Sequence, residues 1–386
     1  MAVAVSSVVE TCRAAKRAAR VLARTDSTIK DAALRAIAAA LRERTSEILA
    51  ANERDMERGR EAAIGDALLD RLRLDEQRIE GIAAAVEQIV ALADPVGEVI
   101  DGGRLPNGLD LRRVRVPLGV VAVVYEARPN VTIDAAALCL KSGNAIVLRG
   151  SSSATESNRA LASIAAHAAV GAGLPEGCVS LVAGGGREEL AELATQSESV
   201  DLIIPRGGEG LKRALQDVAT VPVIYAASGN CHVYVDASAD FEQAEAIVLN
   251  AKTQRPGVCN AAETLLVHER IAEQFVPRVV SALTQAGVVV RAAQDLIDLA
   301  ASAGGALVEP AAEEDWETEY LAPVIALGKV ESVEQAIEHI GRYGSGHSEA
   351  ILTRDTSAAR AFQLGVDAAC VYVNASTRFT DGGEFG

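Results

Sequence analysis

The sequence has few of the features that mark membrane or nucleic-acid-binding proteins. Its longest apolar run, residues 116–125, is shorter than the about 20 residues that a membrane-spanning helix needs. The first ten residues carry no basic stretch before an apolar block, so we expect no signal peptide. Basic residues are outnumbered, with 37 Lys and Arg against 53 Asp and Glu and a formal charge of −16. Sequence-independent nucleic-acid binding needs clustered cations, so we expect neither a membrane nor a nucleic acid as partner.

Cysteine pairs and metal-ligand spacings are also lacking. The six cysteines are scattered, with no C-x-x-C pair and no histidine at a metal-ligand spacing. A disulfide scaffold or a structural zinc site has no pattern to rest on, and we expect no metal. These features indicate a reduced, cytoplasmic protein in which most cysteines are small buried hydrophobes.

The pattern along the 386 residues suggests two or three domains. Residues 1–96 are rich in Ala, Leu and Arg with helical spacing, which predicts helices that pack on a larger domain. Residues 119–236 alternate short Val- and Ile-rich runs with helical stretches, which predicts a parallel sheet covered on both faces. A second α/β unit follows over residues 237–374, and residues 375–386 end in a Gly-rich run. We therefore predict an α/β protein.

Residues 97–118 carry a hairpin signal. Asn107-Gly108 stands between two strand-like runs, and the second run alternates polar and apolar residues. A two-stranded ribbon is marginal in water by itself. We therefore predict that the hairpin adds to another sheet by pairing with a second chain.

The second strand of the alternating region ends in Arg149. In dinucleotide-binding folds an acid at this position selects the free 2′-hydroxyl of the adenosine ribose, whereas an Arg accommodates a 2′-phosphate. Arg149 with the hydroxyl of Ser151 favours NADP(H) over NAD(H); the alternative is a solvated Arg that opens an ordinary loop. Glycine-rich turns at residues 184–186 and 207–210 each lead into a helix, whose N-terminal N–H groups can hold a pyrophosphate. Neither turn matches G-x-G-x-x-G, so each carries little weight by itself.

One cysteine stands in a different setting from the others. Cys259 is near the end of a polar, turn-containing segment, residues 252–260, between a helix and a strand. A thiol reacts as thiolate and needs positive charge or aligned N–H donors nearby, which Lys252, Arg255 and backbone amides can supply. A single cysteine is more often a buried hydrophobe, but this loop setting favours a nucleophile.

Residues 373–383 group hydroxyls, an amide and a guanidinium close together in sequence. Arg can grip a carboxylate or a phosphate bidentately, so this composition suits recognition of an anionic small molecule. The candidate side chains are Asn374, Ser376, Thr377 and Arg378. The alternative is a polar exit loop. His347, in a Gly- and Ser-rich loop, is a weaker candidate for the same role.

Four separated motifs make the sequence recognisable: Y-E-A-R-P-N-V-T at residues 125–132, I-P-R-G-G at 204–208, N-A-K-T-Q-R-P with C-N within 250–260, and the polar run at 373–383. Together they resemble the γ-glutamyl phosphate reductase family, whose members are also called glutamate-5-semialdehyde dehydrogenases, of the aldehyde dehydrogenase superfamily. The resemblance covers essentially the whole chain.

The resemblance implies an aldehyde dehydrogenase-like fold. It assigns residues 119–236 to a Rossmann-type NADP(H)-binding domain, 97–118 to an oligomerisation hairpin and 237–374 to a catalytic domain. Family members continue past the equivalent of Gly386, so we expect residues 375–386 to be a truncated return segment. The resemblance also implies NADPH as cofactor, L-glutamyl 5-phosphate as substrate, a homo-oligomer (dimer or tetramer) and a functional link to glutamate 5-kinase.

Site roles also follow from the resemblance. Cys259 matches the catalytic nucleophile, and Asn130 is the candidate oxyanion donor. Arg149, with Ser151, matches the position beside the adenosine ribose, and Glu319 looks like the glutamate that contacts the nicotinamide ribose. The loop beneath the pyrophosphate corresponds to Arg206, Gly207 and Gly208. The expected substrate contacts are Arg255 and Arg378, for phosphate or α-carboxylate, with Asn374, Ser376, Thr377 and His347.

One departure from the superfamily bears on the reaction. Oxidising members carry a Glu that activates hydrolytic water where this sequence has Ala226-Ala227. Without that base a thioester is poorly hydrolysed, and phosphate becomes the natural acyl partner. We therefore predict NADPH-dependent reduction of L-glutamyl 5-phosphate to glutamate 5-semialdehyde through a Cys259 thioester, the second step of proline biosynthesis. The alternatives are another thioester-forming, CoA-acylating semialdehyde dehydrogenase and a non-catalytic remnant of the fold.

Overall fold

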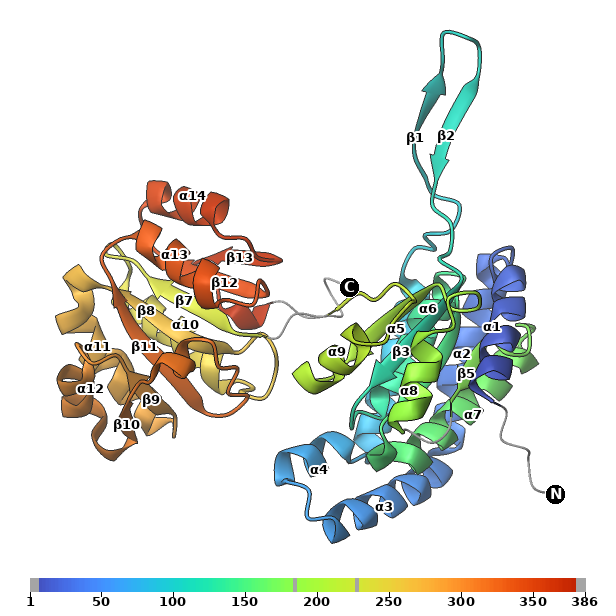
Figure 1. Cartoon of the computed structure of the whole chain (residues 1–386), viewed down its shortest axis with the longest axis horizontal. Coiled ribbons are helices and arrows are strands. Elements are labelled where there is room, and N and C mark those ends of the chain that lie inside the picture. Colours follow the sequence, from blue (N-terminus) through green and yellow to red (C-terminus); the bar gives the residue numbers. More distant parts are fainter. Residues whose placement is uncertain (1–6, 183–185, 226–228, 380–386) are drawn as a thin grey trace. The chain divides into compact units, whose positions relative to one another are not determined.

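The computed structural model describes residues 7–182, 186–225 and 229–379 and divides into two compact units, Met1–Ala226 and Ala227–Gly386. Figure 1 shows a sheet with packed helices in each unit. The predicted α/β class with two parallel sheets is confirmed. Over the three described ranges, no helix has the length and apolar character needed to cross a membrane.

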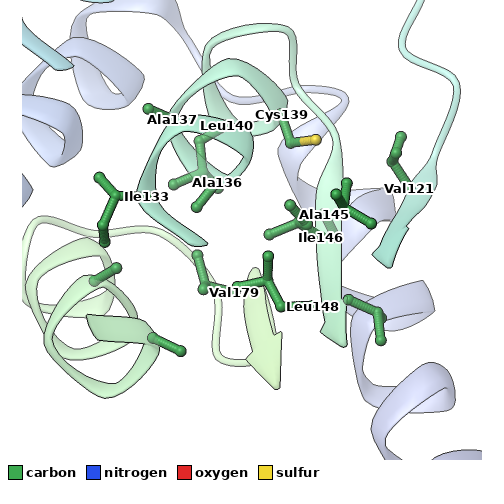
Figure 2. Close-up of a cluster of buried hydrophobic side chains, with 14 of the residues drawn as sticks. Val121, Ile133, Ala136, Ala137, Cys139, Leu140, Ala145, Ile146, Leu148 and Val179 are labelled. Carbon is green, nitrogen blue, oxygen red and sulfur yellow. The ribbon is translucent and has the colours of Figure 1, made fainter. Parts of the chain in front are cut away.

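The first sheet is parallel, with strand order β5-β4-β3-β6. Its strands are β3 (Val120–Tyr125), β4 (Ala145–Gly150), β5 (Val179–Leu181) and β6 (Leu202–Arg206). The helices between and after them are α6 (Asn130–Lys141), α7 (Thr155–Gly171), α8 (Arg187–Ala194) and α9 (Glu209–Gln216). Every residue of β3 and β4 is buried, as expected for strands covered on both faces. In Figure 2, Ala136 and Leu140 of α6 lie among the same buried side chains as Ile146 and Leu148 of β4.

The N-terminal region is helical and packs on this first sheet. Its helices are α1 (Val8–Leu22), α2 (Ser27–Glu43), α3 (Thr45–Glu61), α4 (Asp66–Leu72) and α5 (Glu76–Ala91). Helix α1 contacts strands β3, β4 and β5, whereas α2 contacts α5, α6 and α7. Their apolar faces belong to the same hydrophobic core as the strands, so the helices and the sheet form one folding unit.

The predicted hairpin is confirmed as a two-stranded antiparallel sheet, β1 (Val99–Arg104) with β2 (Asp110–Val114). The turn between them is closed by Gly108 N–H, which donates to the carbonyl of Leu105 at 2.8 Å, and Gly108 has φ +89°. A positive φ costs glycine little, so the Asn-Gly pair suits this turn. All residues of both strands are exposed, and Figure 1 shows the hairpin apart from the four-stranded sheet of its unit.

The second sheet has seven parallel strands in the order β10-β9-β11-β8-β7-β12-β13. The strands are β7 (Cys231–Val235), β8 (Ala262–His268), β9 (Val289–Ala292), β10 (Val308–Pro310), β11 (Val324–Val330), β12 (Ser348–Leu352) and β13 (Cys370–Val373). The helices are α10 (Phe241–Thr253), α11 (Glu269–Gln285), α12 (Ile297–Gly304), α13 (Val333–Tyr343) and α14 (Thr356–Gly365), with a short helix η4 (Thr377–Phe379). Two apolar clusters hold these helices to the sheet.

The predicted boundary between the two domains, at residue 236, is wrong. Strand β7 pairs with β8 and β12 of the second sheet, so the second unit already includes residues 231–235. The last Val- and Ile-containing run before β7, residues 221–225, is not a strand and contributes only a single bridge, Ile203 to Val223. A fully buried parallel strand has the same apolar pattern in either sheet, and its hydrogen-bond partners decide where it belongs.

Candidate active site

Segments that precede four neighbouring strands of the second sheet carry the predicted nucleophile, two residues predicted to lie near it and a glycine that the sequence did not single out. Glu319 precedes β11, Cys259 precedes β8, Gly229 precedes β7 and His347 precedes β12. These strands are adjacent in the order β11-β8-β7-β12 and all parallel, so the four segments meet at the amino edge of the sheet. Burial lowers the pKa of His347, while the negative charge of Glu319 and Glu349 opposes that shift. A neutral imidazole is therefore the favoured form of His347 at neutral pH.

Cys259 is the one exposed cysteine among the six, all of which lie in the described ranges. Cys12, Cys139, Cys178 and Cys231 are buried, and Cys370 is half-buried. Burial raises the pKa of Cys12 and Cys178 to about 11 and that of Cys139 to about 12. Such thiols stay protonated at neutral pH, whereas Cys259 is accessible to a substrate.

Two residues contact the backbone carbonyl of Cys259: Gly229, which precedes β7, and Cys231, which begins it. A Cβ atom added to Gly229 would lie 1.5 Å from the carbonyl oxygen of Cys259, so only glycine fits there. The Cys231 thiol donates to the same carbonyl oxygen at an S–O distance of 3.2 Å. Glu319 joins this arrangement because its Oε1 accepts a hydrogen bond from the Gly229 N–H at 2.8 Å. Cys259, Gly229 and Glu319 are therefore linked through direct contacts.

Lys252 does not supply a cation to Cys259 in the way that the sequence suggests. Its ammonium group is fully buried and pairs with the equally buried Glu263 carboxylate, with 2.5 Å between Nζ and Oε2. Burial lowers the pKa of Lys252 and raises that of Glu263 to about 7, in each case against the attraction of the partner. A buried charge needs such a partner, so the Lys252 charge is used inside the fold.

The two candidate arginines for the substrate both belong to unit 2. Arg255 is exposed in the loop between α10 and Cys259. Arg378 donates from Nη1 to the side-chain oxygen of Asn260, the buried neighbour of Cys259. Ser376 is half-buried and accepts the backbone N–H of Arg378 at 3.2 Å, and Thr377 is fully buried. The segment after β13 thus contacts the loop that carries Cys259, by the hydrogen bond from Arg378 to Asn260.

Asn374 does not join this group. It follows β13 and lies at the carboxyl edge of the sheet, opposite to the edge that carries Cys259. Its side-chain amide makes two bonds with the backbone of Thr353, each of 2.9 Å, and its φ is +54°. Asparagine tolerates this left-handed conformation better than most residues, so Asn374 closes the ends of β12 and β13. The prediction of a substrate contact at Asn374 is therefore withdrawn.

The residues expected to hold a cofactor gather at the carboxyl edge of the first sheet. Arg149, near the end of β4, is only 7% exposed and donates from Nη2 to the carbonyl of Gly186 at 2.9 Å. Its Nε is buried and has no hydrogen-bond partner among the described residues. Ser151, just after β4, accepts the backbone N–H of Ala127 at 3.2 Å and shares a 2.6 Å bond with Ser153. Arg149 thus has one buried polar atom that the described residues do not satisfy.

The turn after β6 lies beside the same edge. Arg206, Gly207 and Gly208 are exposed and lead into helix α9. The Gly208 N–H donates to Oε2 of Glu126 at 3.1 Å, and a Cβ on Gly207 would lie 2.8 Å from the Glu126 carboxyl carbon. A helix N-terminus attracts anions. Here the Glu126 carboxylate accepts a hydrogen bond from one of the N–H groups at the start of α9.

A groove of about 490 Å³ lies between helices α8 and α9 of unit 1. Its walls include the apolar side chains of Leu190, Ala191, Ala214 and Val218. Gly186, which accepts the bond from Arg149, immediately precedes α8. The groove therefore lies on the helices that begin beside Arg149 and the Gly207-Gly208 turn, and its apolar walls suit a flat ring.

Asn130 begins helix α6 in unit 1, and its amide donates to Oδ2 of Asp134 at 2.9 Å. Cys259 belongs to unit 2. The turn residues Gly184 and Gly185, the Ala226-Ala227 pair and residues 380–383 lie outside the described ranges. Within those ranges no cluster of three or more His, Cys, Asp or Glu side chains could hold a metal ion.

Sequence reasoning missed Gly229, Glu263 and Glu126. Glu263 had a visible signal, because it is the one acid inside β8, where all seven residues are buried, and such an acid needs a buried cation. Gly229 had none, since many glycines in α/β folds serve only in turns. Glu126 stands inside a recognised motif, but its contact with Gly208 depends on two strand ends that are far apart in sequence.

Comparison with known proteins places these observations in a family. The model of the aldehyde dehydrogenase family matches residues 2–303 and 307–386. The γ-glutamyl phosphate reductase of Moorella thermoacetica is 54% identical over 96% of this chain and 88% of that protein. That of Thermobifida fusca is 52% identical over the same shares. The crystal structure of γ-glutamyl phosphate reductase from Thermotoga maritima is 46% identical, covers 99% of this chain and 91% of its own, and gives a TM-score of 0.93.

Proposed function

Because the chain belongs to the aldehyde dehydrogenase family, and within it to the γ-glutamyl phosphate reductases, we propose that it reduces L-glutamyl 5-phosphate to L-glutamate 5-semialdehyde and phosphate. This is the second step of proline biosynthesis. The single observation that carries the proposal at the level of the site is the exposed cysteine Cys259, whose backbone packs against Gly229, within a chain that matches the reductases over nearly its full length.

Cys259 is the nucleophile of this proposal. Its thiolate attacks the acyl carbon of the acyl phosphate, phosphate leaves with the bonding electrons, and a thioester forms. The cofactor supplies the hydride that reduces this thioester. The resulting thiohemiacetal collapses, the Cys259 thiolate leaves, and the semialdehyde is released. Phosphate is a good leaving group, so the first step needs no strong general acid.

Backbone N–H groups near Cys259 are the natural donors for the tetrahedral oxyanion, with Asn130 as a further candidate. The Asn130 amide nitrogen carries two hydrogens, and the bond to Asp134 uses one of them. His347, whose pKa is lowered by burial, acts as a neutral hydrogen-bonding group toward the substrate. The contact between Gly229 and the Cys259 backbone restricts the position of the nucleophile. Holding a reacting group in the productive orientation contributes much of an enzyme's rate enhancement.

Two arginines and the hydroxyl of Ser376 are proposed to bind the anionic ends of the substrate. Arg255 is exposed before Cys259, and Arg378 donates to Asn260, the neighbour of Cys259. Ser376 is half-buried and precedes Arg378 in the same segment, whereas Thr377 is fully buried, so the prediction of a substrate contact is not kept for Thr377. A guanidinium binds carboxylate or phosphate through two parallel hydrogen bonds, so these residues match both ends of a glutamyl phosphate.

The nicotinamide cofactor is proposed to be NADP(H), held at the carboxyl edge of the first sheet. The orphaned, buried Nε of Arg149 and the hydroxyl of Ser151 suit a ribose that carries a 2′-phosphate. The groove between α8 and α9 suits the adenine ring, and Gly207 and Gly208 suit the pyrophosphate. Glu126 has to release the Gly208 N–H for that contact. Glu319 is the candidate for the nicotinamide ribose.

The test is an assay of the reverse reaction with glutamate 5-semialdehyde and NADP. We expect NADP reduction that depends on added phosphate or arsenate and that CoA does not replace. Reduction that requires CoA would instead support an acylating semialdehyde dehydrogenase. If neither phosphate nor CoA supports reduction of NADP, although Cys259 is alkylated at a normal rate, the protein is a non-catalytic member of the fold.

The β1-β2 hairpin is proposed to pair with a second copy of this chain. Both strands are exposed along their whole length, and the hairpin carries apolar side chains that are half-exposed or more. These are Val99, Leu109, Leu111, Val116 and Leu118. Exposed strand edges with apolar side chains are sites of strand pairing between chains. Replacing Leu109 and Leu111 with Lys should lower the mass seen by light scattering to that of a smaller species, and an unchanged mass would exclude the hairpin as interface.

A further inference from the structure

The buried Lys252–Glu263 pair has no place in the chemistry described above. Both side chains are fully buried, so neither can touch the substrate or the cofactor. A buried ion pair is by itself weak grounds for stability, because apolar residues of the same size often stabilise as well. Its contacts must therefore explain what it does.

The second carboxylate oxygen of Glu263 leads to the segment that precedes β11. Its Oε1 accepts the backbone N–H of Leu321 at 3.2 Å. Leu321 has φ +51°, a left-handed conformation that a leucine adopts only when its surroundings hold it there. Tyr320, the residue before it, lies with its ring centroid 5.9 Å from the Lys252 ammonium. The pair thus fixes the backbone at residues 320 and 321.

The next step leads from this segment to the nucleophile. Glu319 directly precedes Tyr320, and its Oε1 accepts the Gly229 N–H at 2.8 Å. Gly229 packs against the Cys259 carbonyl so closely that no Cβ would fit. The contacts form a continuous chain from Lys252 through Glu263, Leu321, Glu319 and Gly229 to Cys259.

We propose that Lys252 and Glu263 are positioning residues for the nucleophile: the buried pair holds the backbone at Leu321, so that Glu319 keeps Gly229, and with it Cys259, in place. The inference rests on the proposed function in one respect, that Cys259 is the nucleophile. It assigns the essential contact to the hydrogen bond that Glu263 accepts, and the Lys252 charge serves to keep that carboxylate inside the fold.

Two double variants separate the hydrogen bond from the charge. Lys252→Met with Glu263→Gln removes both charges but keeps an oxygen that can accept the Leu321 N–H. Lys252→Met with Glu263→Met removes both charges and the acceptor, with almost the same side-chain volume. Neither leaves a lone buried charge, which would destabilise the protein for an unrelated reason.

The expected result is a difference in kcat between these two variants. The Gln variant keeps kcat within about threefold of the unaltered enzyme, whereas the Met variant loses about ten- to a hundredfold, as small misplacements of a reacting group do. KM for the semialdehyde stays nearly the same in both, because the altered side chains do not reach the surface. Alkylation of Cys259 by iodoacetamide, which needs no substrate, also slows in the Met variant relative to the Gln variant.

Unit 1 provides a matched control. Lys30 is a buried lysine paired with Asp94, and the other Asp94 oxygen accepts the backbone N–H of Val96 at 3.0 Å. Lys30→Met with Asp94→Asn, or with Asp94→Leu, should change thermal stability without changing Cys259 alkylation. If the Met variant at Glu263 does not fold, Leu321→Val tests the same link against Leu321→Asn. Leu321 is 39% exposed with φ +51°, which a β-branched side chain opposes and asparagine favours, so we expect kcat to fall with Val and to persist with Asn.

Equal kcat and equal alkylation rates in the folded Gln and Met variants would overturn the proposal, as would a loss of kcat of the same size in the Lys30 control variants. A loss that appears as raised KM with unchanged kcat would also overturn it. If the unaltered protein shows no phosphate-dependent activity, the proposed function has failed, and the alkylation rates alone then decide the positioning role.

Discussion

The two parallel sheets hold their candidate residues at opposite ends. In unit 1, Arg149, Ser151 and Gly207 stand at or just after the ends of strands, so they lie at the carboxyl edge where helices α7 and α9 begin. In unit 2, Cys259 and Glu319 precede strands, so they lie at the amino edge. Helix N-termini expose N–H groups and partial positive charge, whereas the amino edge receives helix C-termini.

The difference assigns different tasks to the two edges. The carboxyl edge of unit 1 combines the backbone N–H groups at the start of α9 with the guanidinium of Arg149, and both suit an anion such as a dinucleotide. At the amino edge of unit 2 the preceding helix, α10, ends before Cys259 and presents carbonyl groups. A thiolate there has to be stabilised by side chains and by the amides of its own loop, so the shape of that loop matters more. The fixed contacts among Gly229, Cys259 and Glu319 meet that need.

The largest effect is expected from the nucleophile. Cys259→Ser should fold and bind the cofactor, yet lose roughly a thousandfold or more of its turnover, because a serine hydroxyl ionises far less readily. Alanine at Cys12, Cys139, Cys178 or Cys370 should leave kcat nearly unchanged, since these residues lie in or beside helices and strands and are buried or half-buried. The measurement is phosphate-dependent NADP reduction for each variant. Substantial turnover by folded Cys259→Ser would place the chemistry elsewhere in the chain.

The cofactor edge should respond by a smaller factor. Arg149→Glu places a carboxylate opposite a 2′-phosphate and removes charge-assisted hydrogen bonds that are worth about 1.5–3 kcal/mol. Affinity for NADPH should therefore fall roughly ten- to a hundredfold, with much less change for NADH. Fluorescence titration with each cofactor measures the ratio. Arg159→Glu, on the exposed side of α7, serves as the control. An unchanged NADPH to NADH ratio in Arg149→Glu would argue for an unselective edge.

Local patterns in the sequence were sufficient for much of the fold. Asn107-Gly108 predicted the hairpin turn, and short Val- and Ile-rich runs predicted the buried strands of both sheets. The polar loop around Cys259 distinguished that cysteine from four buried ones before any coordinates. These features depend on turn preference, side-chain periodicity and burial, which a short window of sequence contains.

Features that depend on pairing between distant segments could not be predicted. The pattern of β7 fits either sheet, and only its bonds to β8 and β12 decide. Lys252 looked like a cation for Cys259 until Glu263, eleven positions further on, was seen to take its charge. Asn374 looked like a substrate contact, but its amide bonds to Thr353 at the far edge of the sheet. In each case the partner lies on another element, and sequence spacing does not reveal it.

The smallest expected effect is on the stability of unit 2 at acid pH. His339, on α13 of unit 2, is half-buried with its Nε2 buried, and burial lowers its pKa from 6.5 to about 4. The unfolded chain therefore binds a proton at this residue between pH 6.5 and 4, while the folded chain does not. The stabilising contribution of neutral His339 is complete above pH 6.5 and is lost as the pH falls toward 4.

His339→Phe should remove this part of the acid sensitivity, because phenylalanine cannot bind a proton. The measured quantity is the free energy of unfolding of the variant minus that of the unaltered protein. This difference should shift in favour of the variant by about 1–2 kcal/mol between pH 7.5 and pH 5. Urea unfolding followed by the fluorescence of Trp316, the single tryptophan, reports on unit 2, since its ring lies 5.4 Å from that of His339. Groups that do not contact His339 cancel in this comparison. An equal pH dependence of His339→Phe and the unaltered protein would mean that His339 does not contribute to the acid response of unit 2.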